Sequence, residues 1–300
     1  MKKLFLFAML WLFANMAEAA WPTQNITLIV TSPPGALHDQ IARIIAEDME
    51  QEFKVGVSVL NMPGANFSSA KNYITDRKND NHTFMMVWDN ACCIYTDSQI
   101  NIMAKIYSAP LILVGNKESS ITKLKDQIKN HATVNVATLQ VDTIYDLWTR
   151  SLKSDLNINP IPFNGGVPAI TSTIGGHTDY AVISVPLTKE YMESGMLKPM
   201  MVATRARVPL MPNVPTYAEL GFSGVPAQFW GGVAAKNDIS HEATNTFLYT
   251  ISKIISTDRR IKKLEEIGVN FKLLNHNDTQ KSINDEIKNM QLIKSKIIYK

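Results

Sequence analysis

The stretch ITLIVTSPPGALHDQIAR, residues 26–43, decides the fold of this chain. Its first part, Ile26–Thr31, is the apolar and β-branched run of a buried strand. The turn residues Pro33–Gly35 end that run, and Ile41 and Ile45 fall at helical spacing beyond them. We therefore predict a strand, a tight turn and a helix in succession, which is the repeating unit of a largely parallel α/β sheet.

The same alternation of strand and helix patterns continues along the chain. The predicted strands are residues 26–31, 55–60, 82–88, 109–115, 134–138, 158–163, 180–185, 198–204 and 229–235. A proline-rich connection at residues 209–215 and a short helix near Glu219 precede the last strand, and the rest of the chain is predicted to be helical. Two α/β units in series, followed by a helical tail, indicate two lobes.

We expect an α/β fold in which each lobe is a mostly parallel sheet flanked by helices, with a cleft between the lobes. The first lobe is predicted to comprise residues 20–110 and 229–300, and the second residues 111–228. The strands at 109–115 and 229–235 are expected to cross between the lobes. The helical tail is then expected to return and pack on the first lobe.

The N-terminal residues 1–19 have the pattern of a secretory signal peptide. Lys2 and Lys3 precede an apolar run from Leu4 to Phe13, and Ala17–Ala19 forms an A-x-A cleavage site. A run of about 10 apolar residues is too short for a bilayer, which needs about 20. We therefore predict a periplasmic protein whose signal peptide is cleaved near Ala19.

Composition excludes several classes of partner. The chain has 30 Lys and Arg against 27 Asp and Glu, a net charge of +3, and its lysines are dispersed. No basic groove with interleaved aromatic residues is evident, so nucleic-acid binding is not expected. Cys92 and Cys93 are adjacent, with Cα atoms about 3.8 Å apart, which is closer than the usual span of a disulfide. Two thiols are therefore favoured over a vicinal disulfide.

Several strand-to-helix loops could hold an anion without a cationic side chain. The loop at Pro33–Gly35 precedes a helix whose first turn exposes unpaired N–H groups, and the helix dipole adds positive potential there. The loops at 61–66, 138–143 and 162–168 share this design. On propensity alone, however, Asp39 is better explained as a capping residue or as an i,i+4 partner of Arg43.

Catalytic and metal motifs are weak by contrast. There is no G-x-S-x-G, no H-E-x-x-H and no phosphate-binding glycine-rich motif. His38 beside Asp39 could form an acid–base pair, but a solvent-facing pair in the first helical turn is the favoured interpretation, because no nucleophile stands nearby. We expect neither an enzyme nor a cofactor or metal site.

Taken in order, the loops resemble the extracytoplasmic solute receptors of the tripartite tricarboxylate transporter family. The motifs that carry the resemblance are ITLIVTSPPGALHDQIAR, NMPGAN, NDNHTFMMV, IPFNGGVPAITSTIGGH, MVATRARVPLMPNVPTYAELGF and FWGGVAAK. The resemblance implies a two-lobed periplasmic binding protein that closes on a small organic acid, such as a di- or tricarboxylate, an amino acid or an aromatic acid. It further implies delivery of that acid to membrane permease subunits by a receptor that we expect to be a monomer.

Positions that match the family's loops are the expected ligand-binding residues. They are Pro34, Gly35, Ala36, Leu37, Asp39, Asp89 and Asn90 from the first lobe, and Thr138, Thr143, Asn164, Gly165, Gly166 and Ser184 from the second. The chain departs from the family at Ala36, which replaces a glycine, at the bulky Leu37, and at Asp142, whose charge would repel an anion if it faced the cleft.

These departures leave an alternative open, namely a periplasmic sensing or interaction protein on the same scaffold with an altered or lost ligand pocket. A hydrolase that uses His38 and Asp39 is the third and weakest reading, since the nucleophile is missing.

Overall fold

The computed structural model describes residues 20–63, 67–77, 80–89, 98–141, 143–222 and 226–298. The predicted signal peptide, the pair Cys92 and Cys93, the predicted site residue Asn90 and the predicted repulsive residue Asp142 lie outside these residues. Within the described ranges, no helix is long and apolar enough to cross a membrane.

The strands form one continuous 10-stranded sheet, in the order β2-β1-β3-β9-β4-β7-β5-β6, with β8 and β10 paired to β4. Their bounds are β1 Ile26–Val30, β2 Val57–Asn61, β3 Thr83–Trp88, β4 Ile100–Asn116, β5 Val134–Leu139, β6 Ile158–Phe163, β7 Tyr180–Ser184, β8 Leu197–Val202, β9 Gln228–Lys236 and β10 Asn270–Phe271. Every strand predicted from the sequence is present, with ends that differ by a few residues except at β4.

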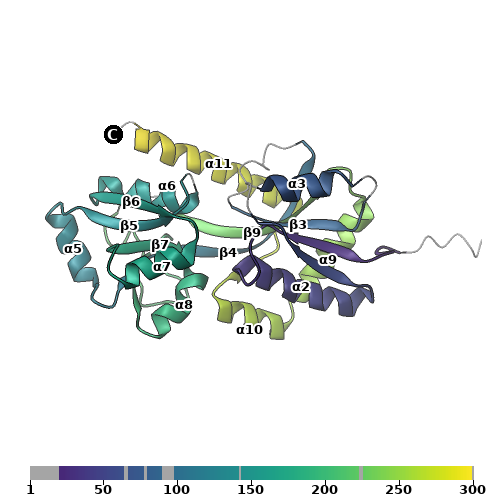
Figure 1. Cartoon of the computed structure of the whole chain (residues 1–300), viewed down its shortest axis with the longest axis horizontal. Helices are drawn as coiled ribbons and strands as arrows, with labels where there is room; N and C mark the ends of the chain where they lie inside the picture. The colour runs from purple at the N-terminus through teal and green to yellow at the C-terminus, as the bar shows by residue number, and fades with distance from the viewer. Residues whose placement is uncertain are drawn as a thin grey trace, which may run out of the picture.

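The long strand β4 joins two parts of the sheet. Its residues 100–110 pair antiparallel with β9, and its residues 111–116 pair antiparallel with β7 and β8. The first part contains the parallel strands β2, β1 and β3, and the second contains the parallel strands β6, β5 and β7. Figure 1 shows these two parts side by side, with β4 and β9 running between them.

Helices cover both faces of the sheet. Their bounds are α2 Leu37–Phe53, α3 Ser68–Thr75, α5 Ile121–Lys129, α6 Ile144–Ser151, α7 Gly166–Ile174, α8 Val185–Glu193, α9 His241–Ile255, α10 Asp258–Ile267 and α11 His276–Ile298, with a short 3-10 helix at Leu152–Ser154. Side-chain caps are found at four of the starts: Ser120, Thr143, Ser240 and Asn275 each accept a hydrogen bond from a backbone N–H of the first helical turn.

Alternating side chains of β1 and β3 build two layers of core in the first part. Leu28 and Phe84 face α2 and α9, where the rings of Phe84 and Phe247 stack 3.7 Å apart. Ile29 and Met85 face the opposite side, with side chains of α3 and α11. The period of two along each strand therefore buries both faces, as expected for a sheet with helices on both sides.

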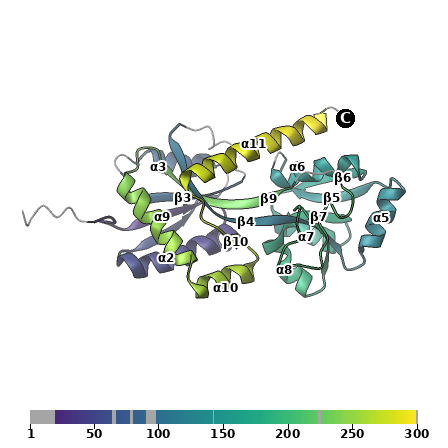
Figure 2. The ribbon, with the colours of Figure 1, turned by 180° about the vertical axis from the view of Figure 1, so that it is seen from behind.

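The last helix, α11, connects the two parts of the molecule. It packs on β4 in its first half and on α6 farther along, and Figure 2 shows it lying across both parts. A buried cluster fixes it to β4: Lys105 Nζ lies 2.5 Å from Glu286 Oε1 and 2.9 Å from Ser282 Oγ. Trp230 Nε1 donates to the other oxygen of Glu286 at 2.6 Å. The tail therefore packs on the first part, as predicted, and also reaches the second.

Three local predictions need correction. The segment near Glu219 is a turn rather than a helix, closed by reciprocal hydrogen bonds between Thr216 and Glu219. β4 begins at Ile100 rather than Ala109, because pairing with β9 extends it. The sequence reading also missed α8, which begins directly after β7 with Pro186 in its first turn.

Candidate functional site

The loop between β1 and α2 is held by Asp39. The Gly35 N–H donates to Asp39 Oδ2 at 2.8 Å, and Asn61 Nδ2 donates to Asp39 Oδ1 at 2.8 Å. Arg43 pairs with the same carboxylate at 3.0 Å. Burial acts to raise the pKa of Asp39, but these hydrogen bonds outweigh it and hold the pKa below its usual value. Asp39 thus serves as both the loop cap and the i,i+4 partner of Arg43.

The other predicted residues of this loop are more open. Pro34 and Gly35 are exposed, and Ala36 and Leu37 are half-buried. Ala36 is the N-cap of α2 and contributes no side-chain cap, so the helix begins at Leu37. Gly35 has φ +81°, a conformation that L-residues rarely adopt. The loop therefore presents backbone groups rather than charged side chains at the start of a 17-residue helix.

His38 does not face solvent, contrary to the sequence prediction. It is 7% exposed, and its ring stacks on Trp88 with centroids 5.5 Å apart and lies 5.1 Å from the ring of Phe229. Its Nδ1 hydrogen-bonds the Tyr107 hydroxyl. Burial lowers the pKa of His38 to about 3. The ring is therefore neutral at physiological pH and supplies no cation to this side of the cleft.

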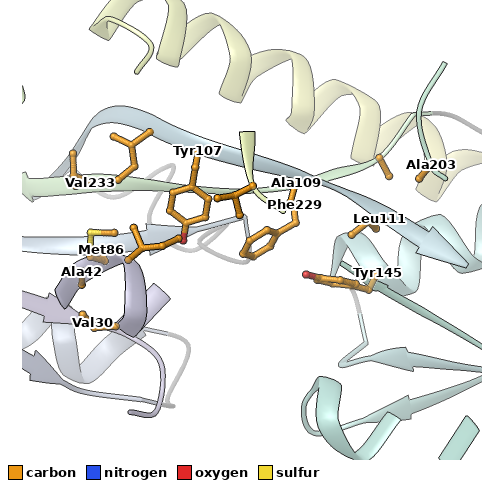
Figure 3. Close-up of a cluster of buried hydrophobic side chains, with 14 of the residues drawn as sticks. Val30, Ala42, Met86, Tyr107, Ala109, Leu111, Tyr145, Ala203, Phe229 and Val233 are labelled. Atoms are coloured by element: carbon orange, nitrogen blue, oxygen red, sulfur yellow. The ribbon is translucent and has the colours of Figure 1, made fainter. Parts of the chain in front are cut away.

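Buried aromatic side chains pack together where the two parts of the sheet meet. Tyr107 and Phe229 come from β4 and β9, whereas Tyr145 comes from α6, and Figure 3 shows the Tyr145 hydroxyl directed toward Phe229. Tyr145 and Phe229 have ring centroids 6.4 Å apart. Gly231 makes this arrangement possible, because a Cβ at that position would overlap the Tyr107 ring.

Asp89 lies next to these tyrosines at the end of β3. Its side chain is buried, and its N–H donates to the Trp230 carbonyl at 3.3 Å. Burial raises the pKa of both Tyr107 and Tyr145, and the nearby Asp89 charge raises each further. A hydrogen bond with Ser184 acts in the opposite direction on Tyr145. Through Tyr145, the structure thus brings together two residues predicted from different lobes, Asp89 and Ser184.

The remaining predicted residues surround the carboxyl ends of β5 and β6. Thr143 caps α6, accepting from the Asp146 N–H, and Thr138 is fully buried in β5. Asn164 is exposed, Gly165 has φ +125°, and Gly166 begins α7 where a Cβ would overlap Leu187. As predicted, Pro168 lies in the first turn of α7.

Two buried hydroxyls at strand ends lack a hydrogen-bond partner within the described part of the chain. They are Ser32 Oγ, just after β1, and Thr138 Oγ1, near the end of β5. A buried hydroxyl without a partner is costly, and such groups in native proteins mark strain or a site that an added group completes. Both lie at the carboxyl ends of parallel strands, where open α/β sheets bind ligands.

A cavity of about 340 Å³ lies between the end of β3, the start of β9, α6 and α11. Its lining residues are Asp89, Ile144, Ala203, Thr204, Arg205, Pro226, Ala227, Gln228, Glu286 and Met290. Only Asp89 among them belongs to the set predicted from the sequence. The others come from α11, the start of α6, the segment after β8 and the start of β9, which no local motif could bring together. The described residues contain no group of three or more His, Cys, Asp or Glu side chains able to hold a metal ion.

Comparison with known proteins agrees with this geometry. Residues 41–298 match the tripartite tricarboxylate transporter family receptor. BugT of Bordetella pertussis is 26% identical over 241 residues, covering 74% of this chain and 73% of that protein. Among solved structures, Rpa4515 of R. palustris with adipate has a TM-score of 0.82 at 22% identity, covering 92% and 98% of the two chains. MatC of Rhodopseudomonas palustris with bound malate has a TM-score of 0.74 at 18% identity, covering 91% and 99%. These likenesses establish the fold as that of a two-lobed periplasmic binding protein.

Proposed function

We propose, from the premise that the chain belongs to the tripartite tricarboxylate transporter receptor family, that it binds a small organic acid between its two lobes. Members of this family are substrate-binding receptors rather than enzymes. The observation that carries the proposal is a pair of buried hydroxyls, Ser32 Oγ and Thr138 Oγ1, at the ends of β1 and β5, which have no hydrogen-bond partner among the described residues. A carboxylate could accept a hydrogen bond from each and from the exposed loop amides.

The neutral state of His38 supports binding through amides and hydroxyls. With a pKa of about 3, His38 carries no charge that would attract an anion, and Arg43 is already paired with Asp39. The predicted loop residues Pro34, Gly35, Ala36 and Leu37 would contact the acid from the first lobe, and Thr138, Thr143, Asn164, Gly165, Gly166 and Ser184 from the second. Asp39 would act by holding the loop in shape.

Thr138→Val tests this role of the hydroxyl. Valine keeps the shape and removes only the partnerless oxygen, so the ligand-free protein should be as stable as wild type or about 1 kcal/mol more stable. Binding of the acid should weaken by about tenfold, the value of one hydrogen bond to a charged group. Isothermal titration calorimetry with di- and tricarboxylates, amino acids and aromatic acids measures the affinity, and urea unfolding measures the stability.

Thr173→Val is the matched control. Thr173 is equally buried, but its hydroxyl bonds the Ala169 carbonyl and the Thr178 hydroxyl. This variant should lose about 1 kcal/mol of stability and keep its affinity. If no small acid binds the folded wild-type protein, the receptor proposal is wrong, and a sensing or interaction role on the same scaffold takes its place.

A second matched pair tests the first loop. Gly35 and Gly195 both have positive φ (+81° and +74°), and a Cβ at either meets nothing within 4 Å. Alanine at each should therefore cost about 1 kcal/mol of stability. Only Gly35→Ala should also weaken ligand binding, because Gly195 follows α8, outside the loops proposed to bind. Equal affinities for the two variants would remove the first loop from the site.

The same proposal includes delivery of the acid to membrane permease subunits and a periplasmic location. It also includes a first lobe of residues 20–110 with 229–300 and a second lobe of residues 111–228. Uptake of a labelled acid by cells lacking the chain should be lost, and the wild-type chain should restore it. The exported protein should have a mass that corresponds to cleavage near Ala19. Uptake that does not depend on the chain would contradict delivery to the permease. An intact leader on the exported protein would contradict cleavage near Ala19.

A further inference from the structure

The sequence contains a single Asn-Gly pair, Asn164–Gly165, in the loop between β6 and α7. The side-chain carbonyl carbon of an asparagine lies within reach of the backbone nitrogen of the next residue. That nitrogen attacks most readily when the next residue is glycine, since glycine has no Cβ to block the approach and is conformationally free. Of all asparagines in the chain, Asn164 is therefore the one whose neighbour hinders this attack least.

The structure leaves this pair open to the reaction. The Asn164 side chain is exposed. Gly165 is the N-cap of α7, with φ +125° and ψ 161°, so its N–H lies before the hydrogen bonds of the helix. Beyond its chain neighbours, a Cβ built on Gly165 would meet only Pro168 Cδ, at 3.9 Å. Within the described part of the chain, neither the Asn164 amide nor the Gly165 N–H has a hydrogen-bond partner to hold it.

Two other asparagines show the contrast. Asn61 Nδ2 donates to Asp39 Oδ1 at 2.8 Å, so the fold holds its side chain in place. Asn213 is exposed, but the next residue is Val214, whose branched Cβ hinders attack by its nitrogen. Exposure, a glycine neighbour and an unbonded amide occur together at Asn164.

We propose that Asn164 is a site of spontaneous deamidation, which alters the loop before α7 as the protein ages. Hydroxide removes the proton of the Gly165 N–H, and the nitrogen forms a bond to Asn164 Cγ. The bond from Cγ to the side-chain nitrogen breaks, and that nitrogen leaves as ammonia with a proton taken from water. Water then opens the cyclic imide at either of its two carbonyl carbons, giving aspartate or isoaspartate. The sum consumes one water and releases one ammonia, without oxidation or reduction.

The consequence for binding rests on the proposed receptor function, in which Asn164, Gly165 and Gly166 contact the acid. The product has a carboxylate where the amide stood, so it adds a negative charge beside an anionic ligand. Two unit charges about 4 Å apart repel each other even in water by the equivalent of about fivefold in affinity. Isoaspartate also adds one carbon to the main chain at residue 164, which displaces the start of α7. Both products should therefore bind the acid more weakly than the fresh protein does.

Peptide mapping by mass spectrometry tests the modification. The full chain is incubated at neutral and at mildly alkaline pH in water enriched in heavy oxygen, and is then digested. Residue 164 should be recovered as aspartate and isoaspartate with a heavy oxygen from the solvent, faster at the alkaline pH because attack needs the deprotonated nitrogen. Asn213 in the same digest is the control and should keep its amide. If Asn164 keeps its amide as long as Asn213 does, the proposal is wrong.

Two variants connect the modification to affinity. Asn164→Asp carries the product charge from the start, and Asn164→Gln keeps an amide whose attack would form a six-membered ring and is slower. Calorimetry with adipate, L-malate, citrate, L-glutamate and benzoate compares fresh and aged samples of each protein. Aged wild type and fresh Asn164→Asp should both bind at least about fivefold more weakly than fresh wild type. Asn164→Gln should keep its own initial affinity during ageing.

The outcomes separate this inference from the receptor function. Modification at residue 164 with equal affinity before and after ageing would show that this side chain does not contact the acid, and the consequence for binding would be wrong. If no acid of the set binds the fresh, folded protein, the receptor function fails, whereas the mapping still decides whether Asn164 deamidates.

Discussion

Acidification should destabilise the folded protein through His38. Its pKa is lowered by burial from 6.5 to about 3. Below pH 6.5, therefore, the unfolded chain binds a proton at this residue that the folded protein does not. The free energy of unfolding then falls by about 1.4 kcal/mol for each pH unit until the folded pKa is reached. Stability from this residue is thus fully present above pH 6.5 and is lost as the pH decreases.

The expected loss at about pH 5 is about 2 kcal/mol relative to about pH 7.5, since about 1.5 pH units separate pH 5 from the unfolded pKa. Urea unfolding of the wild type and of His38→Gln, at pH steps between about 7.5 and 4.5, isolates the contribution. Glutamine can still hydrogen-bond the Tyr107 hydroxyl but does not titrate. The difference in free energy of unfolding between the two proteins should shrink as the pH falls.

Carboxylates titrate in both proteins, so their contributions cancel in the difference in free energy of unfolding between the wild type and His38→Gln. His82, whose pKa burial also lowers, cancels as well. His241→Gln, a change at an exposed residue at the start of α9, should parallel the wild type. If the wild type and His38→Gln lose stability in parallel between about pH 6.5 and 4.5, then His38 is protonated in the folded state and its stacking between Trp88 and Phe229 does not exclude the charge.

Two sets of ion pairs join α2 to helices α9 and α10, and they should contribute different amounts to the free energy of unfolding. Arg260→Met removes hydrogen bonds to Glu47 and Asp48 from a guanidinium that is 2% exposed, and should lower the free energy of unfolding by about 2 kcal/mol. Lys253→Met breaks the half-exposed pair with Glu52 and should lower the free energy of unfolding by less than about 1 kcal/mol. Equal losses of stability for Arg260→Met and Lys253→Met in urea unfolding would contradict the burial argument. Lys105→Met should lower the free energy of unfolding by about 3 kcal/mol, because it leaves the carboxylate of Glu286 without its cation. The double variant Lys105→Met with Glu286→Gln should recover part of that loss. Independent, additive losses in that double-mutant cycle would show that the two side chains do not interact.

The sequence by itself determined the order of elements and most of their positions. The apolar runs at β1 and β3, the turn at Pro33–Gly35 and the cap at Thr143 are local features, and their physical causes act within a few residues. The order of the loops along the chain, which resembles that of the family, likewise predicted the two-lobed fold. The same local reasoning found the two roles of Asp39, because a cap and an i,i+4 pair both lie within one helical turn.

Only the tertiary structure decided what surrounds those local features. His38 has the sequence setting of a solvent-facing residue, and it is buried because Trp88, Tyr107 and Phe229, from three different strands, close over it. The cavity brings Asp89 together with Arg205 and Glu286, which are more than 100 residues away in the sequence. Burial and charge complementarity are sums over neighbours that are distant in sequence, so the protonation of a side chain and the ligand class of a cleft are fixed only when the chain has folded.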